Sequence, residues 1–274
     1  MNLAFKRLQR PMKRKSPENR GVRIGPMSAD DSFKFECHPG VDCFTKCCRN
    51  ADMYLYPYDI VRLKNHLGIT SEVFLAEYTI TAVRDNPYFP SVMLKMSPSE
   101  DKACPFLNDG GCSVYEHRPY SCRVYPVERA VSRIDTKTKP HTFYFVACHP
   151  YCLGHNENRR LTISEWAKDQ NTCEFESMNE LWTEIDTIFR RNPWGEQGTS
   201  SPAFKMAFMA CFNIDQFKKF IGESSFLARF DMDAERLQGV MNSDAELLIF
   251  GFEWIKHFLT GTSFLKQKTG QPLR

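Results

Sequence analysis

The stretch CPFLNDGGCSVYEHRPYSCRVYP, residues 104–126, holds three cysteines and two turn signals. Asn108–Gly111 favours a tight turn between the first two cysteines, and Arg118-Pro119 interrupts any regular element before the third. Thiolates are soft, charged donors, so cysteines at this density predict either a metal site or disulfide cross-links. With six more cysteines upstream and downstream, the candidate metal ligands are Cys37, Cys43, Cys47, Cys48, Cys104, Cys112, Cys122, Cys148 and Cys152.

The size and composition of the chain favour metal binding over disulfides. Its 274 residues can bury a substantial core, so cross-links are not needed as they are in small secreted domains. The cysteine count of eleven is odd, and the N-terminal segment lacks the apolar stretch of a signal peptide. The sequence contains no run of about 18 apolar residues, so we expect no membrane span. We therefore expect a cytoplasmic protein with reduced thiols.

Charge is concentrated at the N-terminus. Residues 1–24 carry eight Lys and Arg against Glu18, whereas the whole chain has a formal net charge of only +3. A basic segment could bind nucleic acid or anionic lipid. No aromatic or helical pattern accompanies this charge, so we expect a solvated arm and no nucleic-acid partner.

Apolar periodicity predicts an α+β fold: a small antiparallel sheet with cysteine-bearing loops and short helices, followed by a mainly helical C-terminal half. Alternation predicts two paired strands over 124–134 and 141–147, with a polar loop between them. A further strand is expected over 88–96, and short helices over 56–68 and 71–78.

From residue 161 the pattern becomes helical. Helix starts are predicted by capping-box spacing at Thr162–Glu165, Ser177–Glu180 and Ser243–Glu246, and by Ser201-Pro202. Residues 190–201 are expected to form a flexible linker. The predicted organisation is a basic flexible arm (1–30), a cysteine-cluster metal-binding domain (31–160), a helical region packed on or following it (161–265) and a frayed tail (266–274).

The cysteine spacings leave several kinds of metal site open. Cys43-x3-Cys47 and Cys148-x3-Cys152 could each supply a ligand pair, while the spacings of ferredoxins and of radical S-adenosylmethionine enzymes are absent. In an extended segment the neighbours Cys47 and Cys48 point to opposite faces, so they would serve two metals or two corners of a cluster. One centre or two remain open.

Other residues near the cysteines have secondary roles in this interpretation. The isolated Cys173 and Cys211 are expected to be buried and inert. Four basic residues could offset thiolate charge: Lys46, Arg49, Arg118 and Arg123. Four histidines could replace a thiolate, although we expect them at the surface or supporting the ligands: His38, His117, His149 and His155.

Three groups of residues are similar to one known family. The first is Cys37, Cys43 and the Cys47-Cys48 pair, followed by the YPYDI helix start at 56–60. The second is the 104–126 stretch with its CPFL, CSVYE, RP and CRVYP motifs. The third is NIDQF (213–217) with FGFEW (250–254). Together they resemble the YkgJ-type cysteine-cluster family, a zinc- or iron-chelating domain, over most of residues 35–260. The family's first block is Cys-x2-Cys-x2-Cys-Cys, whereas here five and three residues separate Cys37, Cys43 and Cys47.

The resemblance implies metal or iron–sulfur binding by these cysteines and does not imply a reaction. We favour an iron–sulfur cluster such as a 4Fe-4S cluster over zinc or iron ions, because ligands drawn from several loops are less typical of zinc ribbons. One branch of related bacterial proteins is linked to lysine methylation of flagellin, so a metal-dependent methyltransferase is one alternative. An electron-transfer component is another, and a third is a zinc-stabilised module whose helical half binds a protein partner. The Gly-x-Gly-x-x-Gly, P-loop and His-Glu-x-x-His motifs are absent.

Overall fold

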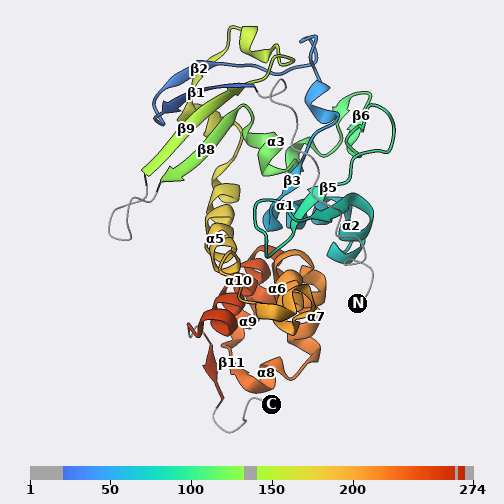
Figure 1. Ribbon diagram of the computed structural model, residues 1–274, viewed down its shortest axis with the longest axis vertical. Helices are drawn as coiled ribbons and strands as arrows, with labels where there is room; N and C mark the ends of the chain where they lie inside the picture. Colours follow the sequence, from blue (N-terminus) through green and yellow to red (C-terminus); the bar gives the residue numbers. More distant parts are fainter. Residues whose placement is uncertain (1–20, 133–140, 263–264, 269–274) are drawn as a thin grey trace. The chain divides into compact units, whose positions relative to one another are not determined.

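The computed structural model describes residues 21–132, 141–262 and 265–268 (Figure 1). Most of the predicted basic arm, the polar loop after residue 132 and the end of the tail lie outside these ranges. The fold class is confirmed, since small antiparallel sheets and short helices precede a mainly helical C-terminal half. Within the described ranges, no helix combines the length and apolar character needed to cross a membrane.

Contacts divide the described chain into two compact units, each made of two separated segments. Residues 21–53 and 95–174 form what we term the cysteine-cluster unit, and residues 54–94 and 175–268 form the helical unit. The domain boundaries expected from the sequence stay a prediction.

A three-stranded antiparallel sheet organises the cysteine-cluster unit. Its order is β1 (Val22–Met27), β9 (His141–Cys148) and β8 (Val127–Ser132). The β8–β9 pair, with Val127 opposite Val146, confirms the two paired strands predicted from alternation. Strand β1 comes from residues assigned to the arm. Its apolar side chains Val22 and Ile24 are largely exposed, so apolar periodicity does not predict this strand.

A second layer completes the core of this unit. Strands β2 (Ser32–Lys34) and β10 (Arg160–Thr162) pair antiparallel, and α4 (Ile163–Asp169) follows directly. The predicted capping box is present: the Glu165 carboxylate accepts from the Thr162 N–H at 2.8 Å, and the Thr162 hydroxyl accepts from the Glu165 N–H at 3.1 Å. The buried core consists of Phe33, Phe35, Val127, Val146, Ile163 and Trp166.

The helical unit begins with a small sheet and two helices. Strands β3 (Tyr54–Leu55), β5 (Ser91–Leu94) and β4 (Thr79–Ala82) form an antiparallel sheet in the order β3-β5-β4. Helices α1 (Pro57–Leu67) and α2 (Ser71–Tyr78) lie where the sequence predicts them. The Asp59 carboxylate accepts from the Tyr56 N–H at the start of α1, and Gly68 ends that helix at a φ of 65°.

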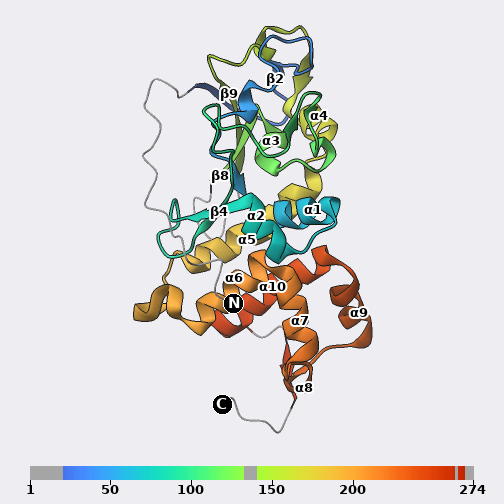
Figure 2. The same cartoon turned by 90° about the vertical axis from the view of Figure 1, so that its right-hand side faces the viewer.

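The remaining helices of this unit are α5 (Cys173–Phe189), α6 (Pro202–Phe212), α7 (Ile214–Glu223), α8 (Phe226–Arg229), α9 (Ala234–Asn242) and α10 (Asp244–Thr260). Strands β11 (Phe230–Asp231) and β12 (Lys266–Gln267) form a short pair. Helices α6, α7 and α10 pack together (Figures 1 and 2).

Two sequence predictions for this region are wrong. Helix α5 begins at Cys173, so Ser177–Glu180 lies inside the helix and does not start it. Residues 190–201 are an ordered segment and not a flexible linker, because Trp194 is buried against Phe89 and donates its indole N–H to the Tyr88 carbonyl at 2.8 Å.

A buried ion network links four elements of the helical unit. The Lys64 side chain of α1 is 6% exposed and lies 3.2 Å from the Asp215 carboxylate and 2.7 Å from that of Asp244. Asp215 also accepts from the Ser71 N–H at 2.6 Å, and the Ser71 hydroxyl accepts from the Asp215 N–H at 3.0 Å. The NIDQF segment quoted above therefore has a structural role, since it connects α7 to α1 and α2.

Candidate metal centre

The first cysteine block (Cys37, Cys43, Cys47 and Cys48) and the second (Cys104, Cys112 and Cys122) are joined by backbone hydrogen bonds. The Cys104 N–H donates to the Cys48 carbonyl at 2.8 Å, and the Asn50 N–H donates to the Lys102 carbonyl at 3.0 Å. Arg49 and Ala103 form an antiparallel bridge between these bonds. More than 50 residues of sequence therefore separate thiols that the fold brings together.

Cys47 and Cys48 lie on a 3-10 helix, Lys46–Cys48, and not on an extended segment. Successive side chains on such a helix point about 120° apart, so neighbours do not face opposite sides. The two thiols are hydrogen-bonded to each other. The expectation that adjacency forces them onto opposite faces is therefore wrong.

The second block is built on a tight hairpin. Strands β6 (Leu107–Asn108) and β7 (Gly111–Cys112) pair with Leu107 opposite Cys112, as the turn signal predicts. A Cβ at Gly111 would lie 3.1 Å from the Phe44 ring, and its φ of 115° favours glycine. The hairpin thereby sets Cys112 close to the first block.

Backbone amides donate to the sulfurs of Cys104, which precedes the hairpin, and of Cys112 on it. Burial raises the pKa of Cys104, while hydrogen bonds from the Phe106 N–H act in the opposite direction. Burial likewise raises the pKa of Cys112, opposed by the Val114 N–H and by the charge of Arg118. Amide hydrogen bonds stabilise a thiolate more than a thiol, so both positions suit metal-bound sulfur.

A third segment contributes Cys148 and Cys152. Cys148 is the last residue of β9, and both thiols pack against the core of the cysteine-cluster unit. The Leu153 N–H donates to the buried Cys43 sulfur at 3.1 Å, which ties this segment to the first block.

The backbone fixes this contact between the third segment and the first block. The Glu36 N–H donates to the Gly154 carbonyl at 3.0 Å, and a Cβ at Gly154 would lie 2.5 Å from the Glu36 oxygen. Only glycine permits so close an approach without movement.

Cys47 interacts electrostatically with thiols of both cysteine blocks. Burial raises the pKa of Cys37 to about 11, with further contributions from the charges of Cys47, Cys43 and Cys152. The charge of Cys47 also raises the pKa values of Cys104 and Cys112. The pKa of Cys47 itself is raised by its hydrogen bond to Cys48 and by burial of its sulfur, although the residue as a whole is exposed.

The sulfurs are gathered but not closely packed. Within the described part of the chain, no three cysteine sulfurs all lie within 4.8 Å of one another. The eleven cysteines, all in described residues, are free thiols.

Three cysteines have different surroundings. Cys122 lies on α3 (Tyr120–Val124), and its sulfur is 3.6 Å from that of Met53, a contact that no sequence pattern indicated. Cys211 is fully buried, as expected, and burial raises its pKa well above the ordinary value. Cys173 is exposed at the start of α5, so the prediction that it is buried is wrong.

The arginines of the RPYSCR segment hold the second block in place. Arg118, 7% exposed, donates to the Tyr115 carbonyl and to the Gln170 side chain, both at 2.5 Å. Arg123, 3% exposed, donates to the Gln170 carbonyl at 2.7 Å and to the Glu116 carbonyl at 2.6 Å. These bonds fasten the loop between Cys112 and Cys122 to the C-terminal end of α4, a structural role beyond charge balance.

A stack of three rings lies beside the cysteines. The His149 ring stacks 6.0 Å from that of Tyr125 and 5.1 Å from that of Tyr151. Burial raises the pKa of Tyr151 to about 12, with contributions from Cys47 and Cys152. Apolar periodicity could not have found this stack, because its members come from a loop and a helix end.

Sequence reasoning also missed a small cluster of oxygen and nitrogen ligands. The ligand atoms of Glu36, His38 and Glu157 all lie within 4.8 Å of one another, and His38 Nε2 is 3.6 Å from the Glu157 carboxylate. His38 Nδ1 accepts from the Gly40 N–H at 3.1 Å, so the neutral ring carries its proton on Nε2, facing that carboxylate. The neutral His38 ring therefore turns a proton, and not a lone pair, toward the Glu157 carboxylate.

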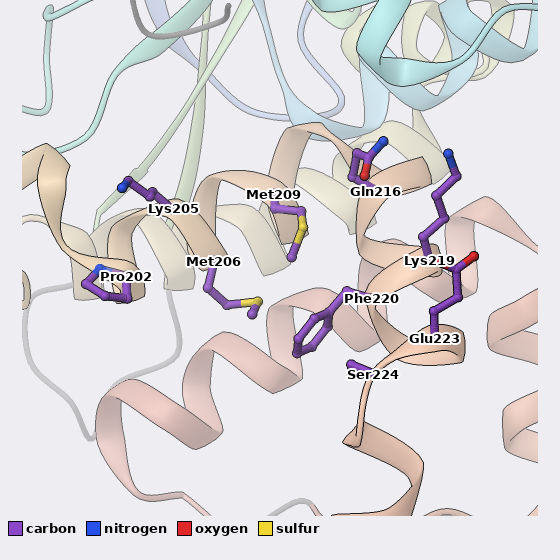
Figure 3. A pocket seen from close by; sticks show the side chains of 9 residues that line it. All are labelled: Pro202, Lys205, Met206, Met209, Gln216, Lys219, Phe220, Glu223 and Ser224. Atoms are coloured by element: carbon purple, nitrogen blue, oxygen red, sulfur yellow. The ribbon is translucent and has the colours of Figure 1, made fainter. Parts of the chain in front are cut away.

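A pocket in the helical unit is unrelated to the cysteine blocks. The side chains of Met206, Met209 and Phe220 face one another between α6 and α7 (Figure 3). Lys205, Lys219, Gln216, Glu223, Ser224 and Pro202 complete its lining. Cys211 is the single cysteine assigned to this unit.

Thiols gathered from three segments, with amide donors aimed at several sulfurs, are a donor set that fits zinc or iron. The fold and site therefore define a cysteine-rich α+β protein of the metal-binding class. A family model, CxxCxxCC, described as a "putative zinc- or iron-chelating domain", matches residues 36–174, and the chain belongs to this family. No curated protein and no solved structure matches the chain.

Proposed function

We propose that the cysteine-cluster unit binds an iron–sulfur cluster, with a zinc or iron ion as the alternative occupant. The candidate ligands are the nine cysteines between residues 37 and 152. The observation that carries the proposal is the position of Cys47, whose charge raises the pKa values of Cys37 in the first block and of Cys104 and Cys112 in the second.

The distribution of the thiols supports a cluster over a single ion. A zinc ribbon takes its ligands from two tight pairs, whereas a cluster binds one thiolate at each of several separate iron atoms. In this chain Cys47, Cys104 and Cys112 lie on three separate turns. Their sulfurs occupy one region of the unit without packing closely together.

When bound, such a cluster supplies one-electron chemistry at a potential set partly by hydrogen bonds to its sulfurs. In this chain the N–H groups of Phe106, Val114 and Leu153 are placed to donate those bonds. Free thiols of this kind persist in a reducing compartment, so we place the protein in the cytoplasm.

Anaerobic purification followed by metal analysis, acid-labile sulfide analysis and an absorption spectrum tests the proposal. We expect iron and sulfide in comparable amounts and broad visible absorption. Cys47→Ser, Cys104→Ser and Cys112→Ser should each lose most of the iron. Cys173→Ser is the matched control, because it removes an exposed thiol outside the group.

Two results would decide against the proposal. Stoichiometric zinc without sulfide in colourless protein would overturn the cluster and leave a zinc site. Full metal retention in all three serine variants would overturn the ligand assignment.

A further inference from the structure

The tautomer of His155 follows from its hydrogen bond. Its Nε2 lies 3.1 Å from the Ala147 carbonyl oxygen, and a carbonyl can only accept, so Nε2 carries the proton. In the neutral ring, Nδ1 is then unprotonated and carries a lone pair that can bind a metal. That nitrogen lies 3.9 Å from the Cys148 sulfur.

This arrangement is the one found in metal-bound histidines. A ligating imidazole usually donates its other N–H to a carbonyl or carboxylate, which fixes both the tautomer and the ring orientation. The ring is held further by Phe35, whose centroid is 5.1 Å away. The glycine contact at residue 154 fixes the backbone immediately before His155.

His38 shows the opposite pattern in the same unit. Its Nδ1 is occupied by the Gly40 N–H and its protonated Nε2 faces a carboxylate, so neither nitrogen is available to a metal. Hydrogen bonding therefore leaves no lone pair of the His38 ring for a metal, whereas it leaves Nδ1 of His155 unprotonated.

The separation of Cys148 and His155 fits two ligands of one ion. Zn–S and Zn–N bonds of about 2.3 and 2.0 Å at a tetrahedral angle place the two ligand atoms about 3.5 Å apart. The observed 3.9 Å is close to this value and long for a hydrogen bond. The Val146 carbonyl lies equally far from the sulfur, so neither acceptor holds the thiol tightly.

We infer that His155 Nδ1 and Cys148 Sγ bind the same metal atom, an iron of the proposed cluster or the single zinc or iron ion of the alternative. The inference rests on the proposed function and adds a nitrogen ligand to it. An imidazole in place of a thiolate removes one negative charge from the centre. This change favours the more reduced state of a redox-active metal.

X-ray absorption spectroscopy of the metal-bound protein tests the inference, because a bound imidazole gives outer-shell scattering that thiolates lack. We expect this scattering in the wild type, its loss in His155→Gln and its retention in His149→Gln. The control removes a histidine of the same loop that stacks between two tyrosines. His155→Cys should keep the metal and gain sulfur scattering, which separates a ligand role from a folding defect.

The outcomes separate the two proposals. Metal without imidazole scattering in the wild type, or loss of that scattering in His149→Gln alone, overturns the histidine ligand while the cysteine site stands. A wild type that retains no zinc or iron under anaerobic purification overturns the proposed function itself, and the present inference falls with it.

Discussion

Replacing Arg123 by methionine should cost the protein about 3 kcal/mol of stability. The guanidinium is 3% exposed and donates to the carbonyls of Gln170 and Glu116 at 2.7 and 2.6 Å. Hydrogen bonds to a charged group contribute about 1.5–3 kcal/mol each, so two of them give about 3–6 kcal/mol. Methionine preserves the apolar stem and removes the cost of burying a charge, which brings the expected loss to the lower end of that range.

Urea unfolding of the metal-bound protein under anaerobic conditions measures this loss. Because Glu116 lies between Cys112 and Cys122, we also expect lower metal content in Arg123→Met. The matched control is Arg23→Met. Its side chain is 63% exposed and pairs with Glu128, so the loss should be about 0.5 kcal/mol. If the two variants lost equal stability, the structural role of Arg123 would be refuted.

Three further predictions concern the ion network, the glycine contact and the metal. Burial alone would raise the pKa of Asp215, but hydrogen bonds from Ser71 and the charge of Lys64 lower it. The stability that this carboxylate contributes is therefore present above about pH 4 and lost as the pH falls further, and Asp215→Asn should flatten that part of the profile of urea midpoint against pH. Gly154→Ala should reduce metal content, because its Cβ would meet the Glu36 carbonyl oxygen at 2.5 Å; unchanged metal analysis would contradict this. Removing the metal with a chelator should lower the midpoint temperature of the calorimetric transition of the cysteine-cluster unit and leave that of the helical unit unchanged. Equal shifts of both midpoints would argue against a local metal site.

Local signals in the sequence predicted local structure well. The Thr162–Glu165 capping box, the hairpin at Asn108–Gly111 and the β8–β9 pair all depend on residues close together in the chain, and all are present. The Ser177–Glu180 spacing failed because the same pair of residues also fits the interior of a helix that tertiary packing extends to Cys173.

The arrangement of the candidate site depends on contacts that no local pattern encodes. The backbone bonds that place Cys48 beside Cys104 join residues more than 50 positions apart, and Leu153 donates to Cys43 over 110 positions. Spacing identified the cysteines as a group but not their neighbours. The position of the proton on His155 also depends on a contact made only in the folded chain, the hydrogen bond to the Ala147 carbonyl.

The interruption of the cysteine-cluster unit by residues 54–94 suggests how it could be isolated. Tyr54 and Met93 face each other in the β3–β5 pair, so the chain leaves and returns at points about 5 Å apart. A linker of a few residues can span that distance, which makes the segment between them removable as a single excision. Joining Met53 to Lys95 through such a linker, and ending the chain near Glu174, would give a miniature protein that could be grafted into a loop of an unrelated host.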